Sequence, residues 1–109
     1  MTTKLVRDKI PQIIKKHTGK SVKFEIASSS KMTQLLKKKL KEEIKELEIA
    51  IKNKDVKEIT EEMADVKEVL NAISKHEKIP LLQVEKRRKE KLRQKGGFKE
   101  RIVMNFSRN

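Results

Sequence analysis

Two stretches of this sequence, residues 32–53 and 56–75, carry acidic residues where a water-soluble helix should present apolar ones. Winding the first stretch at about 100° per residue gathers one apolar face from Leu36, Leu40, Ile44, Leu47, Ala50 and Ile51. Glu43 falls inside this face and Glu46 lies at its edge. The second stretch gathers a similar face from Val56, Ile59, Met63, Val66, Val69, Leu70 and Ile73. Glu62 lies near the centre of that face and Asp65 at its edge, so four carboxylates point at or beside the interior.

The two stretches predict an all-α fold in which two long helices pack antiparallel. A short turn at residues 53–55 joins them, and Asp55 followed by Glu58 is typical of a capping box at a helix start. The 109 residues include three Phe and no Trp or Tyr, so the core of one copy is small. We therefore expect a single domain over residues 1–109, a helix bundle that a homo-oligomer completes.

The remaining segments predict shorter elements around this pair of helices. Pro11 fits the first turn of a short helix that Gly19 ends, and Pro80 opens a further helix that stops at Gly96. Apolar residues alternate with Lys and Glu over residues 22–26, which predicts a short strand. A second strand is expected within residues 98–106, where it would pair with the first.

The lack of cysteine and of long apolar runs limits the compartments in which the protein is expected to act. There is no cysteine, which excludes a disulfide framework and a thiolate metal site. The longest apolar runs are too short to span a bilayer, and the N-terminus lacks the apolar segment of a secretory signal. These features predict a cytoplasmic protein with no membrane partner.

The net charge of +13 is unevenly distributed along the chain. Residues 1–41 hold 12 Lys and Arg against 2 acids, residues 42–85 hold 7 against 12, and residues 86–109 hold 10 against 2. An acidic centre suits cations and basic flanks suit phosphates, so a metal-bound polyphosphate would satisfy both signs. Most of the lysines are nevertheless expected to be solvated surface residues.

The acidic residues form two clamps with helical spacing. Glu42-Glu43-x-x-Glu46 and Glu62-x-x-Asp65 each place carboxylates three residues apart, on neighbouring points of one helix surface. A lone set of this kind is more often solvated, but two sets in matched positions on two apolar faces favour a shared site. Oxygen ligands in this number suit Mg²⁺ or Mn²⁺. We therefore predict that Glu43, Glu46, Glu62 and Asp65 are metal ligands.

These motifs resemble those of the MazG-like and phosphoribosyl-ATP pyrophosphohydrolase superfamily, the all-α NTP pyrophosphatases. The resemblance also covers KLVRDKIPQII at 4–14, KLKEEIKEL at 39–47, EEMADVKEVL at 61–70 and GGFKERIVM at 96–104. These segments are most similar to the small single-domain branch described as house-cleaning nucleotide pyrophosphohydrolases. One departure is Lys95, where relatives are expected to carry Arg, because Lys lacks the planar fork that grips phosphate through two bonds.

The resemblance implies Mg²⁺-dependent hydrolysis of a nucleoside triphosphate to the monophosphate and pyrophosphate. Glu42 or Glu46 would take a proton from the attacking water. Charge and position make eight basic residues candidates for phosphate contact, each with a solvated alternative: Lys4, Arg7, Lys9, Lys86, Arg87, Lys91, Lys95 and Arg101.

Two other functions remain open from the sequence. The basic run at residues 86–95 would suit a nucleic-acid-binding helix, although the lack of Trp and Tyr leaves little for base stacking and makes this reading the weaker one. The chain could also keep the fold and bind nucleotides as a regulator without hydrolysing them.

Overall fold

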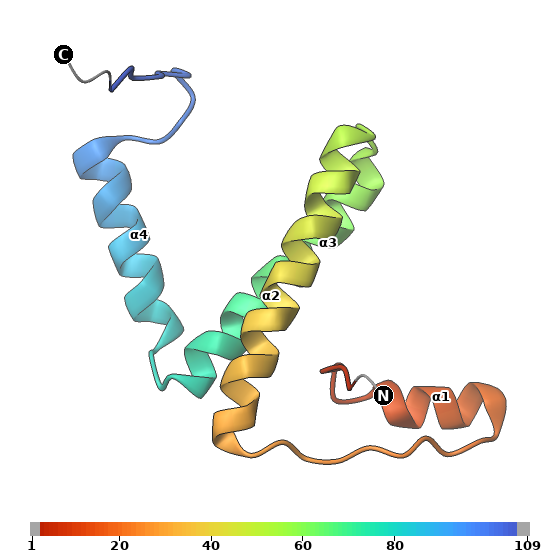
Figure 1. The fold of residues 1–109 in the computed structure, drawn as a ribbon. Helices are drawn as coiled ribbons and strands as arrows, with labels where there is room; N and C mark the ends of the chain where they lie inside the picture. The colour runs from red at the N-terminus through yellow and green to blue at the C-terminus, as the bar shows by residue number, and fades with distance from the viewer. Residues whose placement is uncertain (1–2, 107–109) are drawn as a thin grey trace. The chain divides into compact units, whose positions relative to one another are not determined.

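The computed structural model describes residues 3–106, which form four α-helices (Figure 1). They are α1 (Ile10–Thr18), α2 (Ser29–Lys52), α3 (Val56–His76) and α4 (Leu81–Lys95). The predicted all-α fold class is confirmed. None of these helices is both long enough and apolar enough to cross a membrane.

Helices α2 and α3 form an antiparallel hairpin (Figure 1). Ser28 Oγ caps α2 by accepting a hydrogen bond from the Lys31 N–H at 3.3 Å, and Asp55 Oδ1 caps α3 by accepting from the Glu58 N–H at 3.2 Å. At the open end of the hairpin, a 2.9 Å hydrogen bond joins Thr33 Oγ1 and His76 Nε2. The two helices that carry the predicted metal ligands are thus held side by side at both ends.

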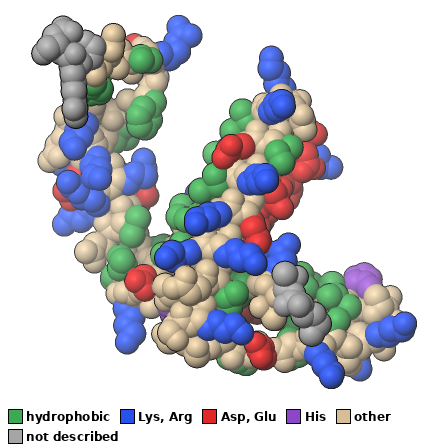
Figure 2. Space-filling view, in the orientation of Figure 1, with side chains coloured by type: hydrophobic (Ala, Val, Ile, Leu, Met, Phe, Trp, Pro, Cys, Tyr) green, Lys and Arg blue, Asp and Glu red, His purple; other side chains and the backbone are tan. Residues whose placement is uncertain are grey.

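The seam of the hairpin buries few apolar side chains. Among the described residues, the buried apolar ones are Leu36, Ala50 and Val69. Other members of the same apolar faces are open to solvent, with Val56 exposed by 76%, Met63 by 53% and Leu70 by 49%. Figure 2 shows hydrophobic side chains at the surface of the hairpin, along one of its edges. Contact between α2 and α3 therefore covers only part of the apolar surface that the sequence provides.

The short helix α1 begins with Pro11 in its first turn and ends at Gly19, as the sequence predicts. Gly19 adopts a left-handed conformation with φ of 73° and donates its N–H to the Lys15 carbonyl at 2.8 Å. That backbone conformation favours glycine, which explains why the helix stops there.

The predicted strands are wrong within the part of the chain that the structure describes. Residues 20–28 are extended without strand pairing, and Phe24 and Ile26 remain exposed. Residues 98–106 form a turn followed by irregular backbone. A strand is stabilised by hydrogen bonds to a neighbouring strand, and an alternating pattern does not by itself supply that neighbour. Instead, the extended segment is tied to α2 by a 2.7 Å ion pair between Glu25 Oε1 and Lys31 Nζ.

The chain divides into two compact units, residues 1–78 and 79–109. The first contains α1 and the α2–α3 hairpin, and the second contains α4 and the segment after it. Helix α4 starts directly after Pro80 and ends at Gly96, which agrees with the prediction. The predicted organisation as one domain over residues 1–109 stays a prediction.

Candidate active site

Three of the four predicted metal ligands meet on the α2–α3 hairpin. Glu43 comes from α2, and Glu62 and Asp65 come from consecutive turns of α3. One carboxylate oxygen from each of the three lies within 4.8 Å of the other two. Oxygens on opposite sides of a Mg²⁺ octahedron lie about 4.2 Å apart, so three oxygens within 4.8 Å would need only small movements to share one ion. We call Glu43, Glu62 and Asp65 the acidic triad.

Two carboxylates of the triad, those of Glu43 and Glu62, each leave one shielded oxygen without a hydrogen-bond donor in the part of the chain that the structure describes. Glu43 is only 7% exposed, and Glu62 is half-buried. Among residues 3–106, the Oε2 atoms of both Glu43 and Glu62 are inaccessible and have no hydrogen-bond partner. A buried carboxylate oxygen without a donor is unfavourable, and a bound cation would remove that penalty. The residues present therefore fit a divalent metal ion.

Burial and the neighbouring negative charges raise the pKa values of Glu43 and Glu62. Burial, the hydrogen bond with Glu46 and the charges of Glu46, Glu43 and Asp65 together raise the pKa of Glu62 to about 7. Burial likewise raises the pKa of Glu43, with Glu46 and Asp65 adding to the effect and Lys39 opposing it. Without a metal, the site therefore retains protons near neutral pH that a cation would displace.

Glu46 and Glu42 lie beside the triad. Glu46 is exposed and helps to raise the pKa of Glu43 and of Glu62, although it does not belong to the 4.8 Å group. Glu42 is half-buried on α2, next to Glu43 in the chain. Glu46 is therefore placed to act at the edge of the site, while its role as a direct ligand stays a prediction.

Two cations border the triad. Arg7 Nη2 donates to Asp65 Oδ1 at 2.7 Å, and Lys39 Nζ lies 3.5 Å from Glu43 Oε1. Arg7 was predicted as a phosphate contact, and the structure brings it to the acidic site. Lys39 was missed, although its position four residues before Glu43 was a visible signal.

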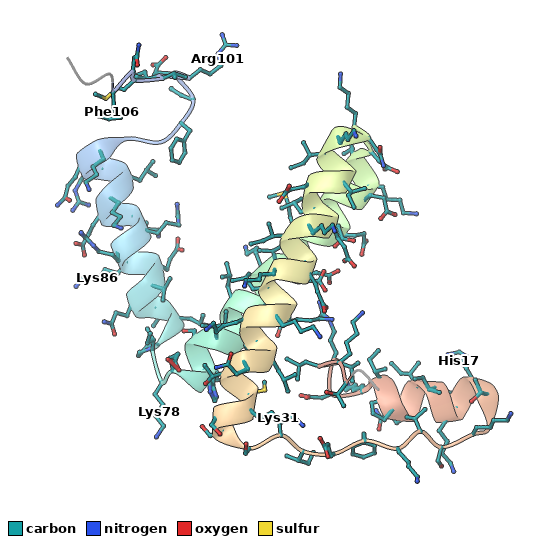
Figure 3. All side chains as sticks on the ribbon, in the orientation of Figure 1. His17, Lys31, Lys78, Lys86, Arg101 and Phe106 are labelled. Atoms are coloured by element: carbon teal, nitrogen blue, oxygen red, sulfur yellow. The ribbon has the colours of Figure 1, made fainter. Side chains whose placement is uncertain are left out.

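The other predicted phosphate contacts fall into two groups. Lys4 and Lys9 are exposed near the start of the chain and form no ion pair within residues 3–106. The remaining five belong to the second unit, where Figure 3 labels Lys86 on α4 and Arg101 in the segment after it. Arg87 and Lys91 line a groove of about 470 Å³ along α4, and Lys95 is the last residue of that helix. Phosphate binding by all of these residues stays a prediction.

The family model for phosphoribosyl-ATP pyrophosphohydrolase matches residues 7–91, a span that contains the whole acidic triad. The chain belongs to the phosphoribosyl-ATP pyrophosphohydrolase family. The predicted resemblance to the MazG-like superfamily is thereby confirmed. Comparisons with curated proteins and with solved structures find no match.

Membership in the phosphoribosyl-ATP pyrophosphohydrolase family supports a nucleotide pyrophosphohydrolase activity in general terms. The family is of a metal-dependent type, and the acidic triad supplies hard oxygen ligands of the kind that such chemistry needs. The acidic triad is thus consistent with the hydrolysis of phosphoric anhydrides.

Proposed function

We propose that the protein is a Mg²⁺-dependent nucleoside triphosphate pyrophosphohydrolase, with Mn²⁺ as an alternative metal. The observation that carries this proposal is the pair of inaccessible, unpartnered oxygens on Glu43 and Glu62, one from each helix of the hairpin. A site of this kind is costly to fold unless a cation binds it. Glu43, Glu62 and Asp65 would hold the ion, with Glu46 at the edge.

The reaction adds water across the anhydride bond between the α- and β-phosphates. When bound, Mg²⁺ would neutralise phosphate charge and lower the pKa of water. The water oxygen attacks phosphorus, the bond to the bridging oxygen breaks, and pyrophosphate leaves with that oxygen. Glu46 is the best-placed acceptor for the proton of the water, because its carboxylate is exposed beside the triad, and Glu42 is the alternative.

Basic residues would stabilise the negative charge that accumulates on pyrophosphate. Arg7 and Lys39 are already at the site, each beside one carboxylate of the triad. Further phosphate contacts are proposed for Lys4, Lys9, Lys86, Arg87, Lys91, Lys95 and Arg101. Cations positioned where charge develops lower the barrier of phosphoryl transfer.

We further propose a homo-oligomer that clears unwanted nucleotides in the cytoplasm. The exposed apolar side chains of the hairpin, such as Met63 and Leu70, support the assembly because a second copy would remove them from water. The house-cleaning role rests on the resemblance of the terminal motifs to that branch of the superfamily.

The test is pyrophosphate release from a panel of ribonucleoside and deoxyribonucleoside triphosphates, with Mg²⁺ and with EDTA. Glu43→Gln and Glu62→Gln should each lower the rate by about 100-fold or more, the scale expected when a group that stabilises developing charge is removed. The matched control is Glu61→Gln, because Glu61 is exposed on the same helix as Glu62. Undiminished release in both triad variants would refute the proposed site.

A nucleic-acid-binding role receives less support from α4. Its basic residues are numerous, but Arg88 pairs with Glu85 at 2.6 Å and Arg87 pairs with Glu90 at 3.4 Å within the helix. These pairs reduce the charge available to a phosphate backbone. Salt-sensitive binding to duplex DNA without metal-dependent hydrolysis would favour this role, and binding of nucleotide without turnover would favour the regulatory alternative.

A further inference from the structure

A cavity of about 220 Å³ lies between α2 and α3, next to the turn that joins them. Glu46 and Glu62 line it, so it opens directly beside the acidic triad. Its other walls include Ile49, Asn53 and Glu58. Pockets for complete drug-sized ligands measure roughly 300–1,000 Å³, so this cavity suits one fragment of a nucleotide.

Charges are distributed asymmetrically on the two sides of the triad. Lys39 precedes Glu43 by one turn of α2, and Arg7 contacts Asp65, the triad member furthest along α3 from the turn. Toward the turn, the cavity is lined by acidic, amide and apolar side chains and by no Lys or Arg. Phosphates are attracted to the side with cations and repelled from the cavity.

We propose that the nucleotide binds along the hairpin with its phosphates toward Arg7 and Lys39 and its ribose in the cavity. This inference rests on the proposed function and adds the orientation and the sugar preference of the substrate. Ribose is the group bonded directly to the α-phosphate, so a fragment site that adjoins the metal ligands receives ribose before base. The base then lies beyond the cavity.

The cavity offers the chemistry that a ribose needs. Asp55 Oδ1 accepts from the Glu58 N–H, while the Glu58 carboxylate forms no ion pair within residues 3–106 and is open to a ligand. A carboxylate can accept hydrogen bonds from the neighbouring 2′- and 3′-hydroxyls, as acidic residues do in dinucleotide-binding folds. Ile49 and Ala50 provide an apolar wall for the carbon face of the sugar. Glu58 is thereby assigned as a specificity residue that favours ribonucleotides over 2′-deoxyribonucleotides.

The test compares kcat/KM for each ribonucleoside triphosphate with that for its 2′-deoxy counterpart. The wild-type protein should prefer the ribonucleotide by about 10- to 100-fold, as expected for one hydrogen bond to a charged group. Glu58→Ala should lower kcat/KM more for the ribonucleotide than for the deoxynucleotide, which keeps only its 3′-hydroxyl. Glu58→Gln should have a smaller effect because its amide oxygen still accepts. Glu61→Ala on the exposed face of α3 serves as the control.

A binding measurement separates this inference from the proposed activity. Calorimetric titration with the α,β-methylene analogues of ATP and 2′-deoxy-ATP in Mg²⁺ should give the same preference, also lost in Glu58→Ala. If no nucleotide is hydrolysed but the preference is observed, the proposed activity fails and the cavity assignment holds. Equal use of both sugars by the wild-type protein, an equal loss for both in Glu58→Ala, or no binding of either analogue would overturn the assignment.

Discussion

Arg7 and Asp65 lie 58 residues apart in the sequence, and a 2.7 Å hydrogen bond joins their side chains at the edge of the acidic triad. Both side chains remain open to water, with the arginine 59% and the aspartate 38% exposed. Exposed ion pairs contribute only about 0–1 kcal/mol to stability. The pair therefore contributes little to folding. Its main consequence is that it holds the positively charged Arg7 guanidinium beside the acidic triad.

Removing the Arg7 guanidinium should impair catalysis more than stability. We expect Arg7→Ala to lower kcat/KM by about tenfold or more, because a charge-assisted contact to phosphate is lost. Arg7→Lys should retain part of the activity, since lysine keeps the charge without the planar fork. Thermal unfolding should change little, and Lys16→Ala on α1 is the control. Full activity in Arg7→Ala would show that Arg7 makes no contact that catalysis needs.

Metal affinity should depend on pH with a transition near neutrality. Glu62 has a pKa of about 7 and must lose its proton to bind a cation, so affinity for Mg²⁺ rises as the pH increases through that value. Calorimetric titration should show tighter binding at pH 8, and it should show proton release on binding mainly at pH 6, where Glu62 still holds its proton. A Glu62→Gln variant should bind weakly at both values. Equal wild-type affinity at both pH values would contradict this protonation scheme.

Glu62→Gln should stabilise the metal-free protein at alkaline pH while it inactivates the enzyme. The pKa of Glu62 rises from an ordinary value of 4.5 to about 7 on folding, so the folded chain holds its proton more tightly than the unfolded chain. The free energy of unfolding therefore falls as the pH rises from 4.5 to about 7, and the loss persists above that range. Glutamine removes this penalty, a gain on the order of 1 kcal/mol after allowance for solvent screening.

Urea unfolding in EDTA at pH 5 and pH 8 measures this effect. The variant should exceed the wild type clearly at pH 8 and much less at pH 5. Glu61→Gln, which changes an exposed carboxylate on the same helix, should show no such difference. A variant less stable than the wild type at pH 8 would mean that the Glu62 carboxylate is not destabilising in the folded chain.

The exposed apolar face of α3 should mediate self-association. Met63 and Leu70 lie two turns apart on that helix and remain about half exposed. We expect the wild-type protein to be a homo-oligomer by size-exclusion chromatography with light scattering, and Met63→Glu with Leu70→Glu to dissociate it. Lys57→Glu with Lys67→Glu is the control pair. A wild-type monomer across micromolar concentrations would refute the assembly.

The sequence predicted the elements that depend on local periodicity. The apolar faces and the acids within them located α2, α3 and the triad, because residues three and four apart are neighbours on any helix. The strand over residues 22–26 was predicted from an equally local alternation and is absent, since a strand also needs a partner that the pattern does not identify.

Contacts between segments that are distant in the sequence could not be predicted from the local pattern of residues. The charge of Arg7 was noticed, but its pairing with Asp65 depends on how the segment before α1 meets the hairpin. The cavity at the turn was missed for the same reason, because it depends on packing between α2 and α3. Lys39 differs from these cases, because its spacing of four residues from Glu43 is enough to predict their ion pair on one helix.

The short connection of residues 53–55 fixes the register between Glu43 on α2 and the other two members of the acidic triad on α3. Every residue added to or deleted from α3 ahead of Glu62 would swing the later side chains around the axis by about 100°. Glu62 and Asp65 would then face away from Glu43, whatever amino acid had been inserted. Substitutions on the outer surfaces are compatible with this geometry, whereas changes of chain length between Glu43 and Glu62 are not, so the number of intervening residues is itself a functional property of the enzyme.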